Sequence, residues 1–276
     1  TGEVLAVGSS YDIKWNTTGG TAANVKLQYA TNGGGIAGNW VDIPGATNLV
    51  NANPGNFAWS IPNVITNQAK VRVVDLSDTD NWNESGVQND PLQGTFKIRP
   101  GLTLVFPNGN ATASLTDKLL VGSIQPIQWI LVGTMTTLKL QLSVNGGVYA
   151  DITTPVLATG INAVTGQTGC TPSPCWNWTV PNNISQQVRV RAVSEADTTV
   201  FDNSDYDFAI RGGFTWTYPT TVGTVFKSGE TKTITWTTTG NMANVNLEYS
   251  TNNGFSYAAM LDGGCWDAGS KMDGRT

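Results

Sequence analysis

Clustered carboxylates are the residues of this sequence that could bind a metal ion. Ten of the twenty acidic residues follow two equivalent Val-Arg-Val motifs: Asp75, Asp78, Asp80, Glu84 and Asp90 in the first group, and Glu195, Asp197, Asp202, Asp205 and Asp207 in the second. Calcium prefers carboxylate and carbonyl oxygens, so Asp75, Asp78 and Asp80 form a candidate calcium site. The spacing does not match an EF-hand loop, and the alternative is that these acids are solvated loop residues.

The sequence contains no histidine, which removes the usual general base and the most common zinc ligand. Two carboxylates across a cleft could still hydrolyse a glycosidic bond. The acids, however, gather in two loops rather than in a pattern that suggests a facing pair. We therefore predict that the chain is not an enzyme, that it has no catalytic residues, and that it binds no cofactor other than the candidate calcium.

Three cysteines are present. Cys170 and Cys175 enclose the short segment TPSP and are predicted to form a local disulfide, with two free thiols as the alternative. Cys265 has no evident partner in the sequence, so it either pairs with a residue outside this chain or stays free.

Five Asn-x-Ser/Thr sequons are candidate glycosylation sites: Asn16, Asn83, Asn110, Asn177 and Asn183. Some sequons arise by chance in a chain so rich in Asn and Thr. Asn16 and Asn177 lie next to expected core strands, and we expect them to be the less favourable sites.

An internal repeat organises the elements that must position these residues. Segments beginning at Tyr11, Gln125 and Thr231 share an alternating strand that ends in tryptophan, a turn, and a second alternating strand. The three tryptophans, Trp15, Trp129 and Trp236, lie 114 and 107 residues apart, which is the size of one β-sandwich. Alternation with period two predicts strands with one buried face, and no segment shows the 3.6-residue period of a helix.

These repeats predict an all-β chain of three antiparallel sandwich domains. Residues 1–100 form the first domain, residues 101–211 the second, and residues 212–276 a partial third with N-terminal strands only. Comparing VGSSYDIKW with VGSIQPIQW shows that the first domain lacks the opening strand that the second has at LTLVF. The linkers Arg99-Pro100-Gly101 and Arg211-Gly212-Gly213 are too short to act as flexible coils, so the domains should form a semi-rigid rod.

A sandwich without its opening strand exposes an unpaired edge and an open groove. One interpretation is that neighbouring copies complete each other by strand addition and so form a filament. The other is that the sequence is a fragment of a longer repeat protein.

The recurring tryptophans have two interpretations. Large aromatic side chains at regular strand positions are usually buried between two sheets. The alternative is an exposed aromatic ladder on which sugars stack. Burial of Trp15, Trp59, Trp129 and Trp178 would favour the first interpretation, and an exposed row of Trp or Tyr would favour the second.

Charge and hydropathy limit the partners. The net charge of -5 and the scattered basic residues argue against nucleic acid and anionic membranes. No apolar run approaches the roughly 20 residues that cross a bilayer, and Thr1 is not followed by a signal-peptide pattern. We expect no membrane insertion.

The residues named above resemble a known group of proteins. A tryptophan on the second strand, a tyrosine before an Asn-rich turn (Tyr29, Tyr249) and the Val-Arg-Val strand resemble fibronectin type III-like and immunoglobulin-like tandem repeats of microbial cell-surface or extracellular proteins. They are also similar to the Ig-like domain of fungal Ser/Thr-rich GPI-anchored wall proteins. The resemblance implies tandem immunoglobulin-like β-sandwiches that are secreted or displayed at the cell surface. The pattern differs from antibody domains because no cysteine pair brackets the core tryptophan.

Together these observations predict an extracellular structural repeat protein, such as a stalk, an adhesin or a component of a surface filament. Its partners would be other copies of itself or surface and wall components. The alternative is an array of non-catalytic, carbohydrate-binding modules attached to a secreted enzyme, with glycans as partners.

Overall fold

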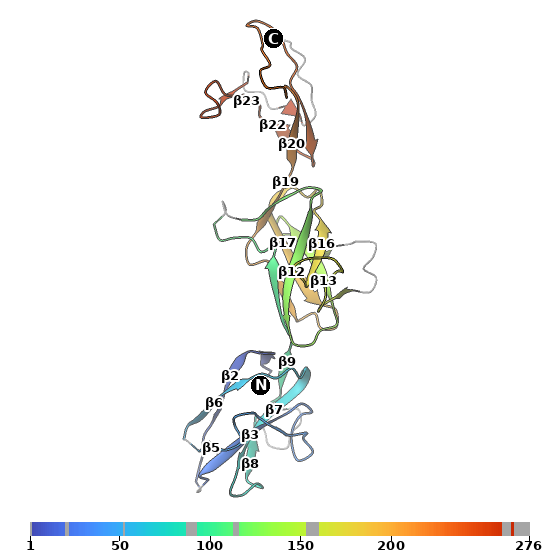
Figure 1. The fold of residues 1–276 in the computed structure, drawn as a ribbon. Helices are drawn as coiled ribbons and strands as arrows, with labels where there is room; N and C mark the ends of the chain where they lie inside the picture. The colour runs from blue at the N-terminus through green and yellow to red at the C-terminus, as the bar shows by residue number, and fades with distance from the viewer. Residues whose placement is uncertain are drawn as a thin grey trace.

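The computed structural model describes residues 2–19, 22–51, 53–86, 93–112, 116–152, 160–260 and 266–267. The described residues contain strands and turns but no helix, which confirms the predicted all-β class. Three units lie end to end (Figure 1), and every sheet is built from strands of a single unit. The first unit holds β1 to β9, the second β10 to β19 and the third β20 to β25.

The second unit is a sandwich of two sheets. One sheet has the order β10 (Gly101–Phe106), β12 (Ile124–Val132), β16 (Cys175–Thr179). The other has the order β11 (Lys118–Leu120), β19 (Phe208–Arg211), β17 (Ser185–Ser194), β13 (Thr137–Val144), β14 (Ala150–Asp151), with β15 (Ile161–Asn162) and β18 (Phe201–Asn203) at its side. Only the β11–β19 pair among these is parallel.

The core of the second unit is sealed between these sheets. Trp129 and Leu104 face each other across the β12–β10 pair and are 2% and 1% exposed. The indole Nε1 of Trp129 donates a hydrogen bond to the carbonyl oxygen of Ala163 at 2.8 Å, so its polar atom is satisfied inside the core. Alternation along β12 places Ile127 on the same inner face, where it is fully buried.

The first unit has the same larger sheet but a smaller second sheet. Its larger sheet has the order β1 (Val4–Ala6), β9 (Phe96–Arg99), β7 (Thr66–Asp75), β3 (Asn24–Ala30), β4 (Val41–Asp42), with β5 (Leu49–Val50) and β8 (Trp82–Glu84) at its side. The second sheet consists of β2 (Ser10–Trp15) and β6 (Gly55–Ser60). Within the described ranges, no strand pairs with the edge of β2 that lies opposite β6.

The third unit is more open than the other two. Its described strands form three two-stranded sheets: β20 (Gly213–Tyr218) with β21 (Thr235–Thr239), β22 (Asn244–Val245) with β25 (Trp266–Asp267), and β23 (Glu248–Tyr249) with β24 (Ala258–Ala259). Trp216 and Trp236 face each other across β20 and β21, and their rings meet edge to face at 6.3 Å. Trp236 is half-buried, unlike its counterpart Trp129.

Both junctions between units contain the same kind of contact. Asn63 of the first unit donates to the hydroxyl of Thr134 at 2.8 Å and accepts from the backbone N–H of Thr134 at 3.0 Å. Asn182 of the second unit, which follows the equivalent proline, accepts from the backbone N–H of Asn241 at 2.8 Å. The second and third units are therefore each joined to the preceding unit through the loop that follows the strand of the recurring tryptophan, β12 or β21. We call β2, β12 and β21, which carry Trp15, Trp129 and Trp236, the tryptophan strands.

None of the described segments forms a helix of the length and apolarity that a bilayer crossing requires.

The difference between Trp129 and Trp15 gives a test of the fold. Replacing Trp129 by alanine removes a fully packed ring, and we expect a loss of about 3 to 5 kcal/mol in the free energy of unfolding of the second unit. Trp15→Ala should cost less, because the Trp15 ring is only half-buried. Hydrogen exchange of the strand peptides, measured in the whole chain, reports each unit separately. Equal losses in the two units would contradict this packing.

Candidate functional site

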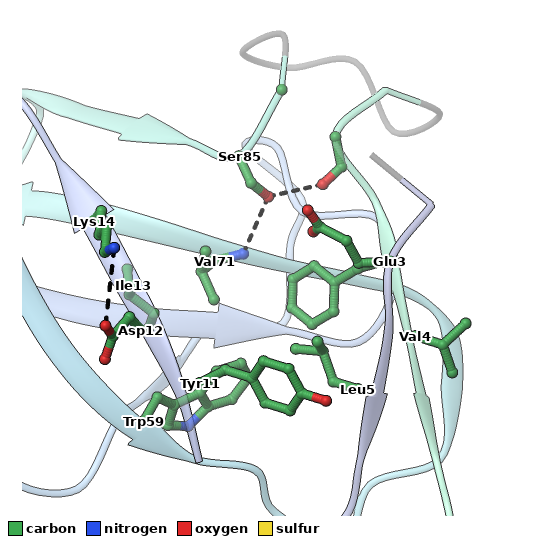
Figure 2. A pocket seen from close by; sticks show the side chains of 13 residues that line it. Glu3, Val4, Leu5, Tyr11, Asp12, Ile13, Lys14, Trp59, Val71 and Ser85 are labelled. Atoms are coloured by element: carbon green, nitrogen blue, oxygen red, sulfur yellow. Dashed lines mark hydrogen bonds and ion pairs between the residues drawn. The ribbon is translucent and has the colours of Figure 1, made fainter. Parts of the chain in front are cut away.

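An open groove runs along the first unit, beside the free edge of β2 (Figure 2). Its volume is about 540 Å³, and its wall includes Leu5, Tyr11, Ile13, Trp59, Val71 and Phe96. In Figure 2 the rings of Tyr11 and Trp59 and the side chain of Leu5 lie along one wall of the groove. The groove is therefore an apolar trough next to an unpaired strand edge.

In the second unit a strand occupies the equivalent position. There β10 pairs with Gln128–Val132 of β12, whose counterparts are residues 14–18, and Leu104 fills the interior beside Trp129. Ile127 and Trp129 are consequently buried, whereas their counterparts Ile13 and Trp15 in the first unit are only half-buried. In the first unit the place of Leu104 is a second hollow of about 240 Å³ beside Trp15 and Asn83, which continues the groove. The groove and this hollow together are the place of a strand that the described part of the first unit does not contain.

Polar groups hold the occupant of this position in the second unit. The carboxylate of Asp202 accepts a hydrogen bond from the backbone N–H of Leu104 at 2.8 Å. The hydroxyl of Ser204 donates to the carbonyl oxygen of Pro107 at 2.8 Å. Asn83 and Ser85 stand at the equivalent positions of the first unit, and Ser85 lines the groove.

The groove can therefore recognise an extended peptide. An unpaired strand edge offers backbone N–H and C=O groups to an added strand, and apolar side chains of that strand enter the trough. Lys14 and Asp12 lie at its rim and form an exposed ion pair of 3.9 Å, which contributes little to stability. The composition of the wall favours binding through burial rather than through charge.

The structure gives the candidate calcium ligands roles in turns. Asp75 accepts hydrogen bonds from the hydroxyl of Ser77 at 2.6 Å, from the backbone N–H of Ser77 at 2.8 Å and from the side chain of Asn81 at 3.3 Å. The Ser77 hydroxyl is the main cause that keeps the pKa of Asp75 below its usual value. Asp78 accepts from the backbone N–H of Asp80 at 3.2 Å.

Three or more metal-binding side chains do not gather anywhere in the described part of the chain. A calcium site at Asp75, Asp78 and Asp80 stays the alternative to the turn role of these acids. Asp90, the last acid of the same cluster, lies outside the described residues.

Glu84 was expected among the solvated loop acids, and this expectation is wrong. Glu84 ends the short strand β8 and is buried, with its Oε1 2.9 Å from the buried Nζ of Lys70. Its Oε2 accepts a hydrogen bond from the backbone N–H of Gly35 at 2.7 Å. A buried carboxylate requires such partners, and removing one member of a buried ion pair is strongly destabilising.

Acids of the second cluster also have specific partners. Asp207 accepts from Arg189 Nε at 2.6 Å, and Asp197 lies 2.5 Å from Arg99 Nε of the first unit. Asp202 holds β10 as described above. Asp197, Asp202 and Asp207 are therefore not simply solvated loop residues, as the sequence suggested.

The predicted disulfide between Cys170 and Cys175 is present, with Cα atoms 5.7 Å apart. Cys175 opens β16, so the bridge closes the loop that leads into this core strand. Cys265 lies outside the described residues.

All five sequon asparagines are exposed: Asn16, Asn83, Asn110, Asn177 and Asn183. Exposure therefore does not set Asn16 and Asn177 apart, contrary to the expectation from their core-strand neighbours. The alternation of the strand explains this, because Trp176 and Trp178 point inward while Asn177 between them points outward. Glycosylation of any of these sites stays a prediction.

Four tryptophans were to decide between a core and a row that binds sugars. Trp59, Trp129 and Trp178 are buried, and Trp15 is half-buried. The outer face of the larger sheet has a different aromatic arrangement, which sequence reasoning missed. In the first unit the guanidinium of Arg72 lies 4.4 Å and 5.0 Å from the ring centres of Trp40 and Trp82.

The second unit repeats this arrangement with Arg191, which lies 3.9 Å and 4.8 Å from the rings of Tyr149 and Phe201. A guanidinium over a ring face is attractive by about 0.5 to 1 kcal/mol at an exposed site. The Val-Arg-Val motif marks Arg72 in the sequence but not Arg191, which follows the second such motif, and the aromatic partners of both arginines come from distant segments.

No family model matches the chain, and no characterised protein matches it in sequence. Among solved structures it is similar to fibronectin(III)-like modules of CbhA from Clostridium thermocellum, at 12% identity and a TM-score of 0.22, over 76% of this chain and 90% of that one. It is also similar to a marsupial T cell receptor, at 13% identity and a TM-score of 0.29, over 94% of this chain and 89% of that one. The β-sandwich fold stated here follows from the sheets described above.

The role of Asp75 can be tested by replacing it with asparagine. The amide keeps the size of the side chain but removes the charge that accepts from Ser77, so we expect a lower melting temperature of the first unit at neutral pH. Because folding lowers the pKa of Asp75, this stabilisation is present above the ordinary value of 3.8 and is lost as the pH falls through the lowered value. The difference between the two proteins should therefore vanish in acid.

Calorimetry with calcium in the millimolar range, where extracellular sites bind, tests whether Asp75 stabilises its turn or binds the metal. We expect the melting temperature of the native chain to stay the same. A rise that Asp75→Asn abolishes would show that the carboxylate is a calcium ligand instead.

Proposed function

We propose that this chain is an extracellular structural repeat protein, in which sandwich units stacked end to end serve as a semi-rigid spacer. A stalk, an adhesin or a surface filament needs such a part, because it must hold other groups at a distance. The observation that carries the proposal is the junction between units, which has the same form in two places along the chain.

The glycines at the junctions support a close and defined contact. Gly133 and Gly240 occupy the same place in their units and both have positive φ, of 95° and 90°. A Cβ on Gly133 would lie 3.1 Å from side-chain atoms of Val7, and one on Gly240 would lie 3.1 Å from Val121. Val7 and Val121 are themselves equivalent, so the same surfaces meet at both junctions.

An ion pair adds to the first junction. Arg99, at the end of β9, lies 2.5 Å from the carboxylate of Asp197 in the second unit. Hydrogen bonds from Thr199 and the charge of Arg99 lower the pKa of Asp197, with the Thr199 hydroxyl as the largest cause. Asp197 thus stays charged at neutral pH, and the pair restrains the angle between the first two units.

The second candidate is a carbohydrate-binding array, which the outer-face aromatic rings of both units would favour. One face of each of these rings, however, is covered by Arg72 or Arg191. Sugar stacking uses open ring faces, so the structural role has the stronger support. Retention of the chain on insoluble polysaccharide, abolished by replacing Trp40 and Trp82, would support the carbohydrate-binding candidate.

The junction is tested by replacing Asn63 and Asn182 together with alanine. Both substitutions remove hydrogen bonds between units without touching a core, so each unit should stay folded. We expect small-angle X-ray scattering to show a flexible string of units in place of the extended, stiff particle of the native chain.

Asn56→Ala is the matched control, because Asn56 is an exposed residue of β6 away from both junctions. It should leave the scattering unchanged. Identical curves for the native chain and for the double variant would contradict a rod that is stiffened at these contacts.

A further inference from the structure

The first and third units are complementary. The described part of the first unit has a groove in the place of an opening strand, and the described part of the third unit has an opening strand whose inner side chains are exposed. The strand β20 belongs to the same type as β10, as GFTWTYP and GLTLVFP show when aligned from Gly213 and Gly101. Each pairs with its own tryptophan strand in the same register, Trp216 with Trp236 and Leu104 with Trp129.

The inner side chains of β20 are exposed, unlike those of β10. Phe214, Trp216 and Tyr218 are 57%, 51% and 39% exposed, whereas Leu104 is 1% exposed. Each buried aromatic side chain removes on the order of 150 to 250 Å² of surface from water. Moving β20 into a closed core would therefore be favourable.

We propose that β20 of one copy seats in the groove of the first unit of a second copy, antiparallel to β2, as β10 seats beside β12. The inference rests on the proposed role as a structural array and adds the way in which copies join. In this register Trp216 lies opposite Trp15 of the second copy, because Leu104 lies opposite Trp129 in the second unit.

Side chains that can bond to the incoming strand stand at the matching positions of the first unit. Asn83 stands where Asp202 accepts from the backbone of Leu104, and its amide oxygen can accept from the backbone of Trp216. Ser85 stands where Ser204 donates to the carbonyl oxygen of Pro107. Pro219 follows β20 as Pro107 follows β10, so the Ser85 hydroxyl, which donates to the carbonyl oxygen of Gly94 at 2.9 Å in the single chain, would turn to an equivalent carbonyl.

The exchange uses the edge of β20 that now pairs with β21. Antiparallel pairing with β2, with the aromatic side chains directed inward, requires this same edge. The pair β20–β21 is a two-stranded sheet among the described strands, and such sheets are marginally stable. The long segment between Tyr218 and Thr235 lets β21 separate from β20 without pulling on the second unit.

Strand exchange would also keep the units of two copies in an end-to-end row. The strand β10 begins directly after the last strand of the first unit, and β20 begins directly after β19 in the same way. When β20 completes the first unit of the next copy, that unit takes the place that the second unit has after the first. Gly19, which corresponds to Gly133 and Gly240, then faces Asn182 of the preceding copy, and a Cβ at this position meets no atom in the single chain.

The test compares the full chain with a chain in which β20 cannot leave β21. Thr215 and Thr237 are exposed and directly opposite each other, so Thr215→Cys with Thr237→Cys can lock the two strands by a disulfide. Both proteins carry Cys265→Ser. In sedimentation experiments we expect the unlocked chain to rise from 29.3 kDa to twice this mass or more with concentration, and the locked chain to stay at the mass of one copy.

A cross-link tests the register. In the second unit Thr103 pairs with Ile130, the counterpart of Asn16, so Thr215 of one copy should lie opposite Asn16 of the next. A mixture of Thr215→Cys and Asn16→Cys chains should give a disulfide-linked heterodimer. Thr237→Cys mixed with Asn16→Cys is the control and should give none.

An unlocked chain that stays monomeric at every concentration would overturn the proposal, and so would a locked chain that still assembles. Scattering from the locked monomer tests the rod separately. An extended monomer that does not assemble would leave the proposed function intact and remove the strand exchange.

Discussion

Each sandwich depends on one constraint: the tryptophan strand must be covered on both of its edges for the interior to be closed. In the second unit β16 pairs with Ile124–Gln128 on one edge of β12 and β10 pairs with Gln128–Val132 on the other, and Leu104, Ile127 and Trp129 are buried. In the first unit β2 has only β6 among the described strands, and a groove opens where the second neighbour would lie. The same alternating sequence therefore gives a closed core in one unit and an open one in another.

The strand that closes a unit also links that unit to the one before it. The covering strand β10 starts two residues after the end of β9, so the strand that closes the second unit is tied to the last strand of the first. The Asn63 contact with Thr134 and the pair of Arg99 with Asp197 then hold the angle between the units. Connections this short leave little freedom between neighbours, which suits a spacer.

Much of the fold follows from local pattern. Period-two alternation around Trp15 and Trp129 predicts the strands, and comparison of the repeats locates the strand that the described part of the first unit does not contain. The Cys170–Cys175 disulfide is predictable from its short loop. These features depend on residues that are neighbours in the sequence.

Other features depend on contacts between distant segments and escape the sequence. The burial of Glu84 requires Lys70 on the adjacent strand and the backbone of Gly35. The rings beside Arg72 come from the segment before β4 and from a different strand, Trp40 and Trp82. The sequence does not distinguish a solvated acid in a polar loop from one that, like Asp202, accepts a hydrogen bond from the strand that closes the core.

The most direct measurement is amide hydrogen exchange of β2 and β12 in the dilute, monomeric chain. The account predicts that the amides of β2 that point away from β6 exchange rapidly, while the amides of β12 that bond to β10 along Gln128–Val132 or to β16 along Ile124–Gln128 are protected. Equal protection of alternate amides along β2 and along β12 would contradict it, because the edge of β2 would then already be covered.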